Sequence, residues 1–330
     1  MSRTTISEVA LNGFAASSSY DKHRPSYPAD AVDQLLYALK VAGVQGARVA
    51  DLAAGTGKFT ELLAARPEQY SIVAIEPHED MKAELERKSL KGVNVVMGTA
   101  DDMSEIADAS FDALIASQVR SQSFTVQRMV LTGRSVVSLV TLPLHSIVNV
   151  VRAKSLVSRF ANRPALEEIH RVLKPTRLLG MIWNIEDYNA PRDWDMTTSW
   201  ESQIRNLTWT LNDDLPRFRH EKWRKCFDDQ LASTPLSLAF ADPLFSLPLG
   251  EGSVKFETWL NKDDIWKRYK TLSQIAVLGR EKLEEVKKEF FNAIDHKDVV
   301  QDEQGRVAVH GHTFFAWTSS IPEQPLRNGG

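Results

Sequence analysis

The chain has 330 residues, a formal net charge of −3 and a sequence pI near 6.3. This length allows one large domain, or one domain with a cap. The charge gives no general attraction to nucleic acid or to an anionic membrane. The single cysteine, Cys226, excludes an internal disulfide and a cysteine-rich metal site. No apolar run approaches transmembrane length and the N-terminus lacks a signal-peptide core, so we expect a cytoplasmic protein without nucleic-acid or membrane partners.

Residues 1–40 form the first predicted unit, an extended segment followed by a helix. Prolines 25 and 28 stiffen the segment, which reads Tyr20-Asp21-Lys22-His23-Arg24-Pro25-Ser26-Tyr27-Pro28. Residues 29–39 then have the apolar period of an amphipathic helix.

A strand, a glycine turn and a helix are predicted over residues 49–60. Gly55 can adopt backbone angles that other residues avoid, so the chain can reverse sharply there. Gly57 has no side chain, which would let a ligand lie against the backbone. The helix that begins near Lys58 offers unpaired N–H groups and a positive dipole end to an anion.

A second acidic residue, Glu76, follows Gly55 by 21 positions, at the end of the apolar run 71–75. A carboxylate at a strand end can accept two hydrogen bonds from a ribose diol, so the pattern indicates a nucleotide-like cofactor on a doubly wound sheet. A nicotinamide fingerprint would need glycine where Thr60 stands. A P-loop would need glycine and a hydroxyl residue where Leu52 and Phe59 stand. A tight turn without a ligand remains an alternative.

The segment Asp51-x-x-x-Gly55-Thr56-Gly57 resembles motif I of the class I S-adenosylmethionine-dependent methyltransferases. The resemblance implies that Asp51 accepts from the ammonium group of the cofactor, beside Gly55, Thr56 and Gly57. In residues 95–103 it implies that Asp101 accepts from the adenine amino group, next to the Ala100 backbone. In residues 111–118 it places Ser117 and Gln118 beside the transferable methyl group.

The N-terminal segment resembles the small-molecule branch that includes trans-aconitate methyltransferase-like enzymes. That resemblance implies that Tyr20, Arg24 and Tyr27 close over the cofactor. Residues 165–183 are similar to the helix and fifth strand of the family, and residues 306–317 to its last strand.

The predicted fold is α/β, with a doubly wound, mostly parallel seven-stranded sheet of the Rossmann-like methyltransferase type and a helical cap. We divide the chain into an N-terminal lid and first helix, a cofactor-binding core, a helical substrate cap, and a last strand with its tail: 1–40, 41–187, 188–300 and 301–330. Residues 188–260 hold five of the eight tryptophans, which could line an apolar substrate pocket.

Two departures from the family pattern stand out. Thr176 and Arg177 replace a Gly-Gly pair in the turn of the fifth strand, so that turn must use another geometry. Residues 119–159 form an atypical insertion directly after Gln118, where family members have a His-Trp pair. The segment is either a real elaboration near the site or a translated non-coding segment. We favour the second because the break falls inside a motif.

These features predict methyl transfer from S-adenosylmethionine to a small organic acceptor, by O-methylation of a carboxylate or a hydroxyl. The alternative is a degenerate protein that binds the cofactor without activity, because the motif after the fourth strand is interrupted. No residue can be named as catalytic. We expect no metal, since His310 and His312 share a strand face without a third ligand at suitable spacing.

Overall fold

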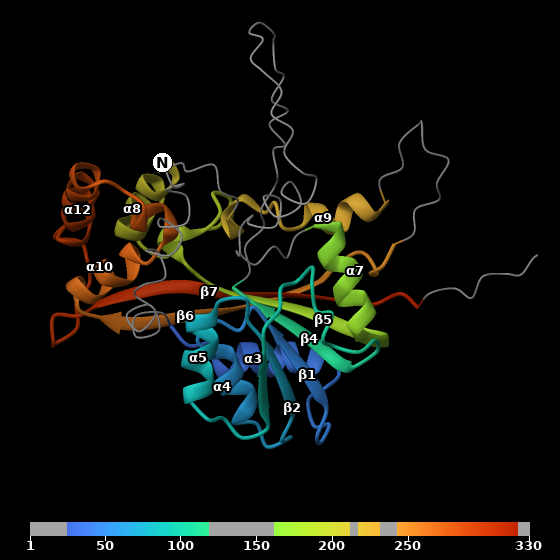
Figure 1. The fold of residues 1–330 in the computed structure, drawn as a ribbon. Helices are drawn as coiled ribbons and strands as arrows, with labels where there is room; N and C mark the ends of the chain where they lie inside the picture. The colour runs from blue at the N-terminus through green and yellow to red at the C-terminus, as the bar shows by residue number, and fades with distance from the viewer. Residues whose placement is uncertain (1–24, 119–161, 212–216, 232–242, 323–330) are drawn as a thin grey trace, which may run out of the picture.

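The computed structural model describes residues 25–118, 162–211, 217–231 and 243–322, shown as the coloured ribbon in Figure 1. The predicted insertion over residues 119–159 lies outside these ranges. So do Tyr20 and Arg24 of the predicted lid.

Five parallel strands make up the first part of the sheet. In chain order they are β1 (Arg48–Leu52), β2 (Ser71–Ile75), β3 (Val93–Val96), β4 (Phe111–Ser117) and β5 (Leu173–Glu186). Their order in the sheet is β3-β2-β1-β4-β5, so the chain turns outward in both directions from the β1–β4 boundary. A crevice forms at the carboxyl ends of the strands where the direction of winding changes, which is the usual ligand position in such sheets.

Two antiparallel strands complete the sheet. β7 (Val307–Ser319) lies between β5 and β6 (Gly250–Leu260), and it is antiparallel to both. Four of the six strand pairings are parallel. The α/β class and the seven strands are therefore confirmed, and the sheet is mixed.

Helices cover both faces of the sheet. α3 (Ala29–Ala38) and α4 (Lys58–Ala64) pack on one face, where their apolar side chains meet those of β1, β2 and β4. α7 (Arg163–Val172) packs on the other face against β4 and β5. α5 (Glu79–Arg87) connects β2 to β3 and sends Leu85 toward the glycine turn.

A second apolar core lies at the far ends of β6 and β7. It is built by α8 (Ser199–Thr210), α10 (Lys262–Lys270), α11 (Ser273–Ala276) and α12 (Arg280–Ile294). Figure 1 shows α8, α10 and α12 gathered at one end of β6 and β7, away from the parallel strands. Shorter turns also occur, namely η1 (Asp187–Asn189), η2 (Phe218–His220), α9 (Lys225–Asp228) and η3 (Asp229–Leu231).

The predicted cap at 188–300 therefore contains helices, but it also contains β6, which belongs to the sheet. Whether the helices cover a substrate stays a prediction. Across the described ranges, no helix combines the length and the apolar character that a membrane span needs. The cytoplasmic location also stays a prediction.

Thr176 adopts a backbone conformation that glycine would usually supply in the turn of β5. Its φ is +65°, in the left-handed region, and its side chain is exposed. The pairing between β4 and β5 shifts at this point, from Phe111–Leu173 to Ala113–Leu178. A β-branched residue is strained in this backbone region.

We therefore predict that Thr176→Gly raises the free energy of unfolding by about 0.5–1 kcal/mol. Relief of the left-handed strain outweighs the entropy that glycine adds to the unfolded chain. Chemical denaturation would measure the change. Thr258→Gly, in the extended backbone of β6, is the matched control and should lose about 1 kcal/mol. Equal losses at both positions would contradict the explanation.

Candidate functional site

The carboxyl ends of β1, β2 and β4 meet at one edge of the sheet. Leu52 is in register with Ile75 on β2 and with Ala116 on β4. The residues that follow these strands, including Glu76 and Gln118, therefore converge with the glycine turn.

Asp51 is fully buried near the end of β1. One carboxylate oxygen accepts from Thr60 Oγ1 at 2.6 Å. The other, Oδ1, is enclosed and has no hydrogen-bond partner in the described part of the chain. Burial raises the pKa of Asp51 to about 7, the Thr60 hydrogen bond opposes the rise, and the nearby Glu76 charge adds to it. Asp51 thus presents a spare acceptor that a cationic donor would satisfy.

Glu76 is also buried, and it holds the glycine turn in place. Its carboxylate accepts from the backbone N–H of Gly55 at 2.7 Å and from that of His78 at 2.9 Å. Burial raises the pKa of Glu76, and these two hydrogen bonds oppose the rise. A carboxylate has about four acceptor positions, so Glu76 keeps capacity for a diol.

Glycine is needed at the two positions of the turn for different structural reasons. Both have positive φ, +59° at Gly55 and +92° at Gly57. A Cβ on Gly57 would lie 2.2 Å from Leu85 Cδ1, whereas a Cβ on Gly55 would meet nothing within 4 Å. The open approach predicted at Gly57 therefore lies at Gly55, and Gly57 instead lets α5 pack closely.

A cleft opens at this turn. Tyr27 packs edge-on against Phe59, with ring centroids 5.2 Å apart, and so brings the described end of the N-terminal segment to the glycine turn. Of the predicted cofactor residues, Gly55, Thr56, Ser117 and Gln118 line the cleft. Its full lining is Pro25, Tyr27, Ala53, Ala54, Gly55, Thr56, Lys58, Phe59, Ser117 and Gln118.

Ala100 and Asp101 lie in the turn that follows β3. Ala100 is buried, and the exposed Asp101 accepts from Thr99 Oγ1 at 2.7 Å. Neither residue lines the cleft itself. Their adenine-binding role stays a prediction.

Two residues of α7 hold the loop that begins with this turn. Glu168 Oε1 accepts from the Met103 backbone N–H at 2.7 Å. Arg171 donates to the carbonyl oxygens of Met103 and Ile106, at 3.0 and 2.8 Å, and pairs with Glu168. The sequence predicted the helix around Glu168, but no local pattern indicated that Glu168 binds a loop more than 60 residues away.

Asn184 is another residue that sequence reasoning missed. Its side chain is buried and donates to the carbonyl oxygens of Pro25 and Ser26, at 3.3 and 3.1 Å. Its Oδ1 accepts from Thr313 Oγ1 at 2.6 Å, and its backbone carbonyl accepts from Gln118 Nε2 at 3.2 Å. Asn184 therefore joins the N-terminal segment to β7 and to the predicted methyl-proximal residue.

Most tryptophans of the predicted cap pack within the apolar cores. Trp223 is buried against Trp183, with ring centroids 4.8 Å apart, and Trp200 is buried in the second apolar core. These rings do not line the cleft at the glycine turn.

The residues present fit a cofactor that carries a cation and a diol. The enclosed Oδ1 of Asp51 lacks a donor, the approach to Gly55 is open, and Glu76 has spare acceptor capacity. Within the described ranges, no group of three or more His, Cys, Asp and Glu residues is placed to hold a metal ion.

Comparison with known proteins finds that this chain is similar to methyltransferases. Residues 49–139 match the family model described as a methyltransferase domain. An uncharacterized methyltransferase-like protein of Schizosaccharomyces pombe is 26% identical over 209 residues, which are 63% of this chain and 62% of that protein. An uncharacterized methyltransferase of Mycobacterium tuberculosis is 29% identical over 180 residues, which are 54% of this chain and 55% of that protein.

The matches thus cover between about half and three fifths of these relatives. Among solved structures, a putative methyltransferase from Bacillus halodurans is 15% identical, covers 87% of this chain and 99% of its own, and has a TM-score of 0.45. The chain therefore resembles methyltransferases over these residues, whereas membership of the class I S-adenosylmethionine-dependent family and of the trans-aconitate methyltransferase-like branch stays a prediction.

Proposed function

We propose that this protein is an S-adenosylmethionine-dependent methyltransferase that O-methylates a carboxylate or a hydroxyl of a small organic molecule. One observation carries the proposal. Two buried carboxylates, Asp51 and Glu76, end adjacent parallel strands and flank a glycine turn that is open at Gly55. A cation and a ribose diol on one ligand satisfy that arrangement.

Each predicted site residue has a role in this proposal. Asp51 holds the cofactor ammonium group and Glu76 the ribose diol. Asp101 and the Ala100 backbone receive the adenine edge. Ser117 and Gln118 border the reacting methyl, and Tyr20 and Arg24 belong to the proposed lid.

When bound, S-adenosylmethionine supplies an electrophilic methyl group. The chain then has to hold the acceptor in line and exclude water. Pro25 and Tyr27 close one side of the cleft, and Asn184 fixes this segment through two backbone carbonyls. We further propose a cytoplasmic enzyme without nucleic-acid or membrane partners, because the net charge of −3 attracts neither.

The competing candidate is a protein that binds the cofactor without catalysing transfer. The sequence after Gln118 departs from the family pattern, which favours this alternative. The intact acidic pair at the glycine turn is common to both candidates, so a transfer assay must separate them.

Nicotinamide binding is disfavoured by Thr60. A dinucleotide fingerprint uses a third glycine here for close helix–strand packing. The Thr60 side chain is instead buried and donates to Asp51.

Titration calorimetry with S-adenosylmethionine, S-adenosylhomocysteine and NAD tests the proposal directly. We expect binding of the first two, and we expect Glu76→Ala to weaken it by about 1–3 kcal/mol because charge-assisted hydrogen bonds are lost. Glu79→Ala, on the first turn of α5, is the control and should leave affinity unchanged. Tight NAD binding without a response to S-adenosylhomocysteine would refute the assignment.

The raised pKa of Asp51 predicts a pH dependence. Its folded pKa of about 7 lies above the ordinary 3.8, so Asp51 contributes a decrease in stability as pH rises from about 4 to 7. Ionised Asp51 binds an ammonium group better, so affinity for S-adenosylhomocysteine should increase between about pH 5.5 and 7.5.

Asp51→Asn is the matched variant. It should bind more weakly and lose most of this pH dependence, with the remainder due to Glu76. Calorimetry across the pH range measures both effects. A slope that is unchanged in Asp51→Asn would assign the titration to another group.

The hydrogen bonds from α7 to the loop after β3 predict that a substitution on α7 changes cofactor affinity. Arg171→Met should weaken S-adenosylhomocysteine binding by about 1–2 kcal/mol, because carbonyl oxygens of Met103 and Ile106 lose their donor. Arg163→Met, on the same helix, removes an exposed pair with Glu167 and should change affinity little. Equal affinities in the two variants would show that the loop does not need Arg171.

A further inference from the structure

β5 extends past the end of β4. Ile182 is opposite Ser117, the last residue of β4, and residues 183–186 then pair, among the described residues, with β7 alone. The Gln118 side chain reaches the other edge of this extension, where Nε2 donates to the Asn184 carbonyl. This edge of β5 therefore begins at the predicted methyl-proximal residues.

Glu186 is the last residue of this edge. Its side chain is 1% exposed, and its Oε2 atom is enclosed without a hydrogen-bond partner among the described residues. Glu201, another buried acid of this region, accepts from Thr198 Oγ1, from the His310 backbone N–H and from a ring nitrogen of His310. A buried carboxylate without donors is costly, so Glu186 calls for an explanation that Glu201 does not.

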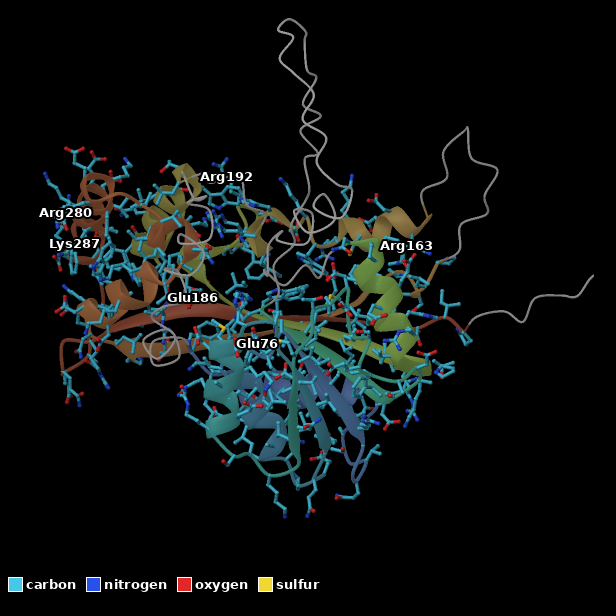
Figure 2. The ribbon with its side chains drawn as sticks, in the orientation of Figure 1. Glu76, Arg163, Glu186, Arg192, Arg280 and Lys287 are labelled. Carbon is cyan, nitrogen blue, oxygen red and sulfur yellow. The ribbon has the colours of Figure 1, made fainter. Side chains whose placement is uncertain are left out.

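The position of Glu186 indicates what it serves. Alternate residues of a strand share a face, so Glu186 follows Asn184 on one face, about 7 Å further along β5. Asn184 itself contacts Pro25, a residue of the cleft. Opposite Glu186 on β7 is Gly311, which has no side chain to supply a partner. Figure 2 shows Glu186 between the parallel strands that end at Glu76 and the helices near Arg192.

A second acid, Asp187, directly follows. Its Oδ1 is likewise enclosed without a partner among the described residues, but its other oxygen has a structural use. One of its oxygens accepts from the Thr197 backbone N–H at 3.0 Å and so fixes the segment that leads to α8.

Building on the proposed function, we propose that Glu186 is a catalytic residue that contacts the acceptor, and that the acceptor atom is a hydroxyl oxygen and not an ionised carboxylate. A hydroxyl donates to Oε2 and satisfies the enclosed atom. A carboxylate acceptor would bring a second negative charge beside Glu186 in a poorly hydrated site, where like charges repel strongly.

The proton balance of the reaction fits this assignment. The acceptor oxygen forms a bond to the methyl carbon, the bond from that carbon to sulfur breaks, and its electron pair stays on sulfur. The hydroxyl proton passes to Glu186, which later releases it to solvent. A carboxylate acceptor carries no proton and would leave Glu186 without a role.

The type of product tests the acceptor class. Purified protein is incubated with small-molecule extract and S-adenosylmethionine labelled in the methyl group, and the products are then treated with mild alkali. Methyl esters release labelled methanol, whereas methyl ethers keep the label. We expect a retained label on oxygen.

The following results would overturn one proposal or the other. Labelled methanol, or a product methylated on nitrogen, overturns the hydroxyl assignment and leaves the proposed methyltransferase function intact. Absence of S-adenosylhomocysteine binding together with absence of transfer overturns the proposed function itself.

Glu186→Gln tests the residue. The initial rate of label transfer should fall on the order of 10²-fold or more, as for loss of a general base, while the dissociation constant of S-adenosylhomocysteine stays within about twofold. An unchanged rate would remove Glu186 from the mechanism.

Thermal unfolding provides a measurement that does not depend on activity. Removing an unpartnered buried charge should raise the Tm of Glu186→Gln on the order of 2–4 °C. Glu201→Gln is the matched control and should lower Tm, because its carboxylate has three donors. A fall in Tm of similar size in both variants would show that Glu186 is a structural acid, which contradicts the proposal.

Discussion

The unequal lengths of β4 and β5 are the constraint on which the rest of this molecule depends. β4 ends at Ser117, while β5 continues to Glu186 and there pairs, within the described ranges, with β7 alone. The extra length separates the parallel strands from the second apolar core, which packs on Val307 and Val309 at the far end of β7. On this extension of β5, Gln118 and the N-terminal segment meet at Asn184. The cleft and the helical region are therefore joined by one pair of strands.

Buried acids near the carboxyl ends of the strands lower the stability of the fold. Asp51 Oδ1 and Glu186 Oε2 are both enclosed without donors among the described residues, and burial raises the pKa of Glu76. Each costs free energy that the apolar cores on both faces of the sheet must offset. Buried acids that lack donors are characteristic of sites prepared for a ligand, since a protein can tolerate such costs where binding relieves them.

Local patterns predicted the strand, glycine turn and helix around Gly55, but they did not predict β6 or the contacts of Asn184. The turn at Gly55 and the acid at Glu76 lie within 21 positions, so both signals are readable in one short stretch. β6 was missed although its side chains alternate in exposure, because Gly250 and Gly252 lie beneath the rings of Trp317 and Phe315, contacts that no local pattern shows. Asn184 was missed for the same reason, since its partners are 129 and 158 residues away. The left-handed conformation of Thr176 could not be predicted from local sequence, because it accompanies the shifted register between β4 and β5.

One departure from the family pattern falls directly after β4, on the acceptor side. The residues expected around the cofactor are present, whereas the His-Trp pair expected after β4 is absent. A histidine there would have offered a base for a hydroxyl acceptor. Glu186 is the proposed base on the neighbouring strand, since β5 continues past the last residue of β4 in the described part of the chain. A base supplied by β5 does not require the interrupted segment, so the loss of the histidine and the retention of the cofactor residues are compatible with one active enzyme.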